Sequence, residues 1–268
     1  MGYWFDGQWF DQDFIQLPIA EPGLLYGATI FTTLRVYEQN LFHPLTHWSA
    51  HGDRLRQHLA ELEWPSPDWQ ELTQGAIALA QDYPVLRITI FPTGKAWMMG
   101  RSLPVDLAQR QHQGITAWLM PPGQFQRSLA HWKTGNYFAP YLAQQTAKRQ
   151  QSQEAILTNR AGHWLETSTG NLWGWRGDTF FTPIFTGEQL PGITHHYLSQ
   201  WILEQGAIVR HKTWTPSLIK DLQGLAYSNS VVEIIPINKV HADFQEPLYL
   251  SSGHGTQYQL LADYFRTF

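Results

Sequence analysis

The chain has 268 residues, of which 43% are hydrophobic and only 15% charged, and its formal net charge is −4. This balance excludes a disordered chain and gives no basic surface for nucleic acid. It favours an oligomer, because little charge is available to cover a solvated surface. No apolar run approaches the ~18 residues of a membrane span, and the N-terminal residues lack the features of a signal peptide. The chain has no cysteine, so we expect a cytoplasmic protein without disulfides.

The first 120 residues read as hairpins and strands with two helices between them. Tyr3–Phe10 places Asp-Gly between two aromatic runs, which is the strongest short hairpin signal. Thr46 can cap a helix whose leucines recur at helical spacing through Leu62, and residues 66–68 can start a second helix that ends near Tyr83. The predicted strands are residues 28–37, 85–91 and 115–119.

Residues 121–124 contain consecutive prolines and form the best candidate linker. Beyond it the spacing predicts helices over 137–150 and 194–204. The predicted strands are 155–158, 163–167, 172–176, 179–182, 207–211 and 230–236. Strands and helices without regular βαβ alternation indicate an α+β protein, with domains over 1–120 and 125–268.

Lys133 is a candidate for covalent chemistry. It lies among aromatic and neutral residues, and no acidic residue occurs between Asp106 and Glu154. If such a lysine is buried, its pKa falls, which suits an amine that forms a Schiff base and then moves protons. The alternative is a linker lysine whose stem covers aromatic surface while its charge stays in water.

Three further features have both a structural and a functional interpretation. Leu190–Thr194 precedes a predicted helix and would offer N–H groups to an anion, or Thr194 simply caps the helix. Glu166 is either a solvated loop acid or a buried one that needs a cationic partner. Arg54 faces solvent, pairs with a carboxylate or holds a phosphate. The histidines, including the pair His195-His196, lack metal-ligand spacing, so we predict no metal site.

The order of these pieces is more informative than any one of them. His51–Leu55 reads His-x-x-Arg-Leu, Lys133–Tyr137 reads Lys-x-Gly-Asn-Tyr, and Glu166–Trp173 reads Glu-x-Ser-x-Gly-Asn-Leu-Trp; Leu190–Thr194 and Ser228–Ile237 follow. This series resembles the class IV, or fold type IV, pyridoxal-phosphate enzymes: branched-chain and D-amino acid aminotransferases and 4-amino-4-deoxychorismate lyases. The resemblance implies a homodimer with a smaller N-terminal α/β domain and a larger C-terminal mixed α/β domain.

The resemblance also implies a pyridoxal 5'-phosphate site. Lys133 would form the Schiff base and shuttle protons, and Glu166 would keep the pyridine nitrogen protonated. Tyr137 would lie beside the phenolate oxygen of the cofactor. The phosphate would be held by Arg54, the Ile193 and Thr194 amides, Ser230 and the Val231 amide.

Within the family, Phe31–Val36 reads Phe-Thr-Thr-Leu-Arg-Val and resembles the aminodeoxychorismate lyases. Alternation on a strand puts Phe31 and Thr33 on one face, so Thr33 would approach the substrate. By the same resemblance Tyr26 and Phe31 would line the substrate site, and Arg101 would receive a carboxylate or remain an exposed loop charge. His195 stands where the family usually has arginine.

We therefore expect an enzyme with a small-molecule substrate. The first hypothesis is a lyase that converts 4-amino-4-deoxychorismate to 4-aminobenzoate and pyruvate, a reaction of folate biosynthesis. The second is an aminotransferase of branched-chain or D-amino acids. The third is an aromatic-rich binding protein without catalysis, since thirteen tryptophans can stack on a ligand as well as fill a core.

Overall fold

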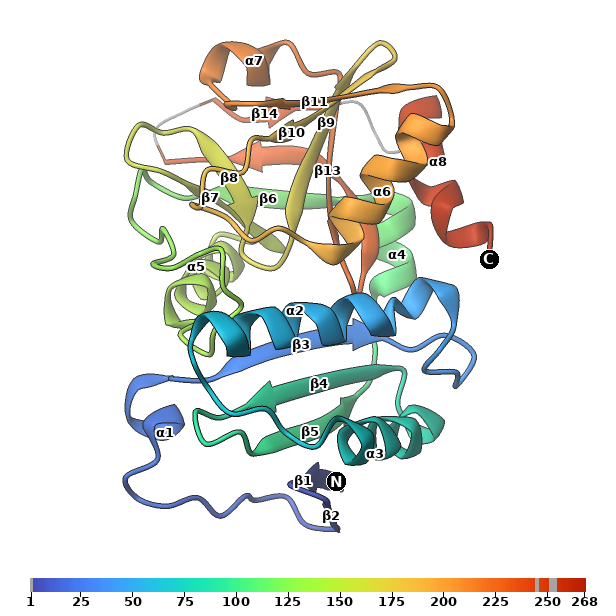
Figure 1. The fold of residues 1–268 in the computed structure, drawn as a ribbon. Helices are drawn as coiled ribbons and strands as arrows, with labels where there is room; N and C mark the ends of the chain where they lie inside the picture. Colours follow the sequence, from blue (N-terminus) through green and yellow to red (C-terminus); the bar gives the residue numbers. More distant parts are fainter. Residues whose placement is uncertain (1, 244–245, 251–254) are drawn as a thin grey trace. The chain divides into compact units, whose positions relative to one another are not determined.

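The computed structural model describes residues 2–243, 246–250 and 255–268. The chain divides into two compact units. The first unit comprises residues 1–105 and 132–137, and the second comprises residues 106–131 and 138–268. Each is a sheet covered by helices, as the α+β prediction requires (Figure 1).

The first unit is built on an antiparallel five-stranded sheet in the order β2-β1-β5-β4-β3. The hairpin predicted at Tyr3–Phe10 is confirmed, with Asp6 and Gly7 both at positive φ in its turn. The strands are β1 (Tyr3–Phe5), β2 (Gln8–Phe10), β3 (Ile30–Arg35), β4 (Val85–Ile90) and β5 (Ala96–Arg101).

Helices α2 (Trp48–Glu61) and α3 (Trp69–Asp82) cover one face of this sheet (Figure 1). The leucine spacing in α2 is explained by burial, because Leu55 and Leu59 are each 1% exposed in the core. The predicted helix start at residues 66–68 is confirmed, and Asp68 caps α3 with its carboxylate. The opposite face of the sheet carries Phe31 and Thr33, which alternate with the core residues of β3.

Thr46 does not cap α2, which corrects the sequence prediction. The chain first makes a 3-10 turn, η1 (Pro44–Thr46), and His43 caps this turn by accepting the Leu45 N–H. His47, in the left-handed conformation, then precedes α2 without a side-chain cap. Because Pro44 fits the first position of a helical turn, the turn begins before Thr46. The remaining helix of this unit is the five-residue α1 (Pro22–Tyr26).

The second unit contains a nine-stranded mixed sheet in the order β11-β10-β9-β12-β13-β6-β7-β8, with β14 paired to β13. Its strands are β6 (Ile115–Leu119), β7 (Glu154–Thr158), β8 (Trp164–Thr167), β9 (Asn171–Arg176), β10 (Thr179–Pro183), β11 (Ile208–Lys212), β12 (Gly224–Asn229), β13 (Glu233–His241) and β14 (Leu248–Tyr249). Its helices are α4 (Leu107–Gln113), α5 (Phe138–Arg149), α6 (Ile193–Glu204), α7 (Pro216–Lys220) and α8 (Thr256–Asp263), followed by η2 (Tyr264–Arg266).

The division differs from the one expected near residue 120. The chain passes from the first unit to the second after Val105, because β6 pairs in parallel with β7 and β13. The expected linker 121–124 therefore lies within the second unit. The apolar run predicted as one strand over 230–236 is also divided, since residues 230–232 turn the chain between β12 and β13.

Candidate active site

Lys133 belongs to a short segment that is bonded to the edge of the first sheet. The Phe31 N–H donates to the Lys133 carbonyl at 2.8 Å, and the Gly135 N–H donates to the Thr29 carbonyl at 2.7 Å. The Lys133 N–H in turn donates to Nε2 of His58 on α2 at 3.4 Å. The backbone that carries the lysine is therefore fixed by both β3 and α2.

The amine of Lys133 lies against aromatic rings. Its Nζ is 4.7 Å from the centroid of the Phe31 ring and 5.5 Å from that of Tyr137. These two rings meet edge to face with centroids 5.5 Å apart. Three of the residues predicted from the sequence are thus brought together around one amine, in an environment that favours a cation–π contact.

Arg54 lies on α2 and is held by a hydroxyl. Its Nη2 donates to Oγ1 of Thr32 at 2.7 Å, and the same hydroxyl contacts Nδ1 of His51. Burial, opposed by the charge of Tyr137, lowers the pKa of Arg54 to about 10. Its Nε is buried without a hydrogen-bond partner, and no carboxylate among the described residues forms an ion pair with it.

His51 is neutral because burial, followed by the charges of Arg54, His47 and Lys133, lowers its pKa well below 6.5. Since a guanidinium can only donate, the Thr32 hydroxyl accepts from Arg54, and the same hydroxyl lies within hydrogen-bond distance of Nδ1 of His51. The three side chains form a hydrogen-bonded chain that includes the arginine predicted to hold phosphate.

Arg87 on β4 is a residue that the sequence analysis missed. Arg87 pairs with Thr33 across the two strands, so its side chain lies on the same face of the sheet as those of Phe31 and Thr33. Its Cζ is 3.7 Å from the Phe31 ring centroid. Burial and then the charge of Arg101, opposed by Tyr137, lower the pKa of Arg87 to about 10. In the part of the chain that is described, neither Arg87 nor Arg101 pairs with a carboxylate.

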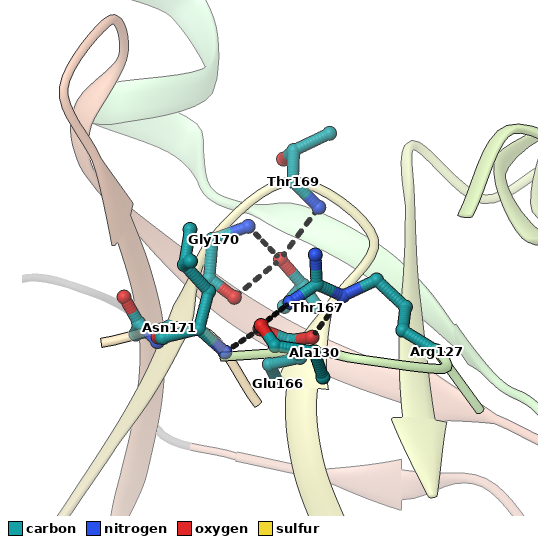
Figure 2. Close-up of polar contacts among 8 residues, drawn as sticks. Arg127, Ala130, Glu166, Thr167, Thr169, Gly170 and Asn171 are labelled. Carbon is teal, nitrogen blue, oxygen red and sulfur yellow. Dashed lines mark hydrogen bonds and ion pairs between the residues drawn. The ribbon is translucent and has the colours of Figure 1, made fainter. Parts of the chain in front are cut away.

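Glu166, at the end of β8, is buried and lies on the second unit (Figure 2). Its Oε1 accepts from Nε of Arg127 at 2.8 Å, and its Oε2 accepts from the Leu190 N–H at 3.1 Å. The cationic partner that a buried glutamate needs is therefore Arg127, which sequence reasoning did not identify. The only available signal was that Arg127 is the nearest arginine before Lys133.

The turn before α6 is fixed from two sides. Nδ2 of Asn171 donates to the Leu190 carbonyl at 2.8 Å, while Glu166 accepts from the N–H of the same residue. Gly192 is required here, because a Cβ on it would lie 2.0 Å from Oδ1 of Asn171. The N-cap of α6 is Gly192 and not Thr194, so the interpretation of Thr194 as the helix cap is wrong.

The start of α6 offers donors to an anion. Within the described residues, the N–H groups of Ile193, Thr194 and His195 have no hydrogen-bond acceptor. The Thr194 hydroxyl lies 3.0 Å from the Ser230 hydroxyl. The Val231 N–H is already bonded to Oδ1 of Asn229 at 2.9 Å. The hydroxyls of Thr194 and Ser230 therefore meet at the positive end of a twelve-residue helix.

His195 faces the core and not the solvent. Its Nε2 lies 2.8 Å from the Thr182 hydroxyl, which itself donates to the Leu172 carbonyl, and its ring stacks on Trp173 with centroids 4.6 Å apart. Burial, aided by His211 and His196, lowers the pKa of His195 to about 3. A neutral ring suits this buried position.

Tyr26 and the histidines complete the comparison with the sequence. Tyr26 on α1 is 76% exposed, so its predicted contact with substrate stays a prediction. The part of the chain that the structure describes holds no group of three histidine or acidic side chains placed to bind a metal. No helix among the described residues is both long and apolar enough to cross a membrane.

Comparison with known proteins identifies the class. A family model described as amino-transferase class IV matches residues 29–240, so the chain belongs to this family of pyridoxal phosphate enzymes. It is 22% identical to an aminodeoxychorismate lyase of Vibrio harveyi over 84% of this chain and 88% of the relative. It is 23% identical to a branched-chain-amino-acid aminotransferase of Escherichia coli K12 over 88% of this chain and 84% of the relative.

Solved structures show the same fold. A branched-chain amino acid aminotransferase of Escherichia coli superimposes with a TM-score of 0.83 at 22% identity, covering 99% of this chain and 93% of that one. A hypothetical aminotransferase of Mycobacterium tuberculosis in its PLP-bound form gives a TM-score of 0.81 at 18% identity, covering 98% of each chain. The protein is thus a pyridoxal phosphate enzyme with the fold-type-IV architecture, acting as a lyase or an aminotransferase.

The residues present fit this cofactor. Its phosphate needs cations and N–H donors, and Arg54 has a buried Nε without a partner among the described residues, while α6 has unbonded N–H groups. Its protonated ring nitrogen needs an anion, which a buried glutamate paired with arginine would provide. Its aldehyde needs an amine, which Lys133 would supply.

Proposed function

We propose that the protein is a lyase that converts 4-amino-4-deoxychorismate to 4-aminobenzoate and pyruvate. The observation that carries this proposal is the pair of arginines on one face of the first sheet, Arg87 and Arg101, for which the described residues provide no carboxylate. A substrate with two carboxylates would supply the missing anions. The lyase-like sequence of Phe31–Val36 and the similarity to the Vibrio harveyi enzyme support the same choice.

In this proposal each predicted residue has a role toward the cofactor. Lys133 attaches to its aldehyde, Glu166 meets its ring nitrogen and Tyr137 lies beside its phenolate oxygen. The phosphate is bound by Arg54, Ile193, Thr194, Ser230 and Val231, the last after its N–H leaves Asn229. When bound, the cofactor supplies an electron sink next to the substrate amine.

The residues of the chain then perform the proton transfers. Once the substrate's own amine has replaced it at the aldehyde, the Lys133 amine would be free to remove the proton from the ring carbon that bears the amino group. The C–O bond to the enolpyruvyl group breaks, the departing enol gains a proton to become pyruvate, and the ring becomes aromatic. Thr33, Arg87 and Arg101 share one face of the sheet, where we place the substrate with its carboxylates on the arginines.

The test is product analysis. Purified protein is incubated with chorismate, glutamine and a synthase that forms 4-amino-4-deoxychorismate, and 4-aminobenzoate is measured by chromatography. We expect it to form with the native chain and not with Lys133→Ala. A native chain that binds the cofactor but yields no 4-aminobenzoate would exclude the lyase.

The second candidate is an aminotransferase of branched-chain or D-amino acids. It is favoured by the aromatic surroundings of the Lys133 amine, where Phe31 and Tyr137 would pack against an apolar side chain. In this case a single amino acid, added without any other substrate, would convert the cofactor to its amine form. A panel of L- and D-amino acids read by absorption spectroscopy distinguishes the two candidates.

We also propose that the protein is a homodimer and resides in the cytoplasm. Helix α1 has no buried residue, and its Leu24, Leu25 and Tyr26 are 62%, 55% and 76% exposed. Adjacent exposed apolar side chains are typical of an interface, and a second copy is the simplest partner. Light scattering should give the dimer mass, which Leu24→Ser/Leu25→Ser should lower to the monomer. The lack of cysteine supports the proposed cytoplasmic location.

A further inference from the structure

Arg127 connects two parts of the second unit. Its Nε donates to Oε1 of Glu166 at 2.8 Å, and its Nη2 donates to the carbonyl of Ala130 (Figure 2). Both members of the ion pair are buried, with side chains 6% and 7% exposed. Ala130 lies three residues before Lys133 in the sequence. One guanidinium therefore fixes the glutamate and also shapes the chain that leads to the lysine.

The electrostatic consequence concerns the charge of Glu166. A carboxyl group removed from water tends to hold its proton, whereas an adjacent guanidinium stabilises the ionised form. The Leu190 N–H adds a donor on the other oxygen. Only an ionised carboxylate can accept a hydrogen bond from a protonated ring nitrogen and balance its charge.

We propose that Arg127 is a positioning residue that keeps Glu166 ionised and correctly oriented toward the ring nitrogen of the cofactor. The proposal rests on the role given to Glu166 above. It assigns to Arg127 an action through Glu166, without contact with the cofactor. The matching structural explanation, that the ion pair only stabilises the second unit, makes a different prediction for ligands that lack the ring nitrogen.

The experiment compares two ligands: pyridoxal 5'-phosphate and its deaza analogue, in which a carbon replaces the ring nitrogen. Dissociation constants are measured for the native chain, Arg127→Met and Arg127→Lys. If Arg127 acts through Glu166, Arg127→Met raises the dissociation constant of pyridoxal phosphate roughly 10-fold to 100-fold and leaves that of the analogue nearly unchanged. Arg127→Lys, which keeps the charge but loses the planar geometry, should recover part of the affinity.

Equal weakening of both ligands, or no weakening of either, would overturn the proposal. If Arg127→Met does not fold, Arg127→Lys is measured in its place, because it keeps the charge but loses the planar geometry that orients Glu166. It should bind pyridoxal phosphate more weakly than the native chain does and the analogue equally well, whereas a preference for pyridoxal phosphate equal to that of the native chain would contradict our assignment. A native chain that fails to prefer pyridoxal phosphate shows separately that the role of Glu166 is wrong.

Discussion

The guanidinium of Arg87 lies 3.7 Å from the centre of the Phe31 ring, the same ring that the Lys133 amine approaches to 4.7 Å. Two cations thus share one aromatic neighbour. Ordinarily such charges are compensated by acidic groups, yet no carboxylate pairs with Arg87 within the described residues. The aromatic face offsets part of the desolvation of each cation and leaves the donors of Arg87 for an incoming anion.

Arg87→Gln should weaken the binding of an anionic substrate. We expect KM to rise roughly tenfold or more with a smaller change in kcat, because a contact made equally in the ground and transition states affects mainly KM. Steady-state kinetics of 4-aminobenzoate formation provide the measurement. Arg176→Gln is the matched control, since Arg176 is half-exposed and pairs with Asp221 on the surface. An unchanged KM for Arg87→Gln would show that this arginine does not hold the substrate.

Lys133→Ala should remove both catalysis and the covalent attachment of the cofactor. Borohydride reduction followed by mass spectrometry should find the added mass on Lys133 of the native chain and nowhere in the variant. Lys95→Ala is the control, because Lys95 is exposed and forms only a 3.7 Å surface pair with Asp6. Attachment at another lysine in the native chain would contradict the assignment.

Thr32→Val should reduce the affinity for phosphate. The substitution keeps the shape of the side chain but removes the hydroxyl that orients Arg54 and binds His51. We expect inorganic phosphate and pyridoxal phosphate to bind roughly tenfold more weakly, as measured by calorimetry. Thr32→Ser keeps the hydroxyl and should bind both ligands as tightly as the native chain does. Thr89→Val serves as control, because the buried Thr89 hydroxyl has no hydrogen-bond partner among the described residues.

His195 should make the fold sensitive to acid. Its pKa is about 3 in the folded chain against 6.5 ordinarily. Between these values the unfolded chain binds a proton that the folded chain does not, so the free energy of unfolding falls as the pH drops from 6.5 toward 3. The contribution is about 1.4 kcal/mol per pH unit. Above pH 6.5 it is constant.

Urea denaturation at several pH values measures this slope. His195→Gln should reduce the slope by about one proton, while the buried His51 continues to contribute in the same direction. His196→Gln is the control, because His196 is exposed on the same turn of α6. A slope that stays the same in His195→Gln would mean that another group titrates.

Local signals predicted much of the fold. The Asp-Gly hairpin, the leucine spacing of α2 and the Asp68 cap each act within a few residues. By contrast, β5 has the sequence Ala-Trp-Met-Met-Gly-Arg, without β-branched residues, and it is a strand because β1 and β4 pair with it. The unit boundary depends on the pairing of β6 with β13, more than 100 residues away.

The candidate site shows the same limit. Lys133, Glu166 and Arg54 became candidates because their motifs occur in a characteristic order. Arg87 and Arg127 could not, since their importance depends on which residues the fold places beside them. A buried Glu166 needs a cation, but only the tertiary structure shows that Arg127 provides it.

Both backbone polar groups of Leu190 form hydrogen bonds with side chains. Its N–H donates to Glu166, and its carbonyl accepts from Asn171. An engineer who lengthens or remodels the loop ahead of α6 to accept a bulkier anion would thereby also disturb the acid predicted to serve the pyridine ring. Redesign of this loop must therefore take Glu166 into account, and libraries that vary residues 190–192 should vary position 171 in parallel.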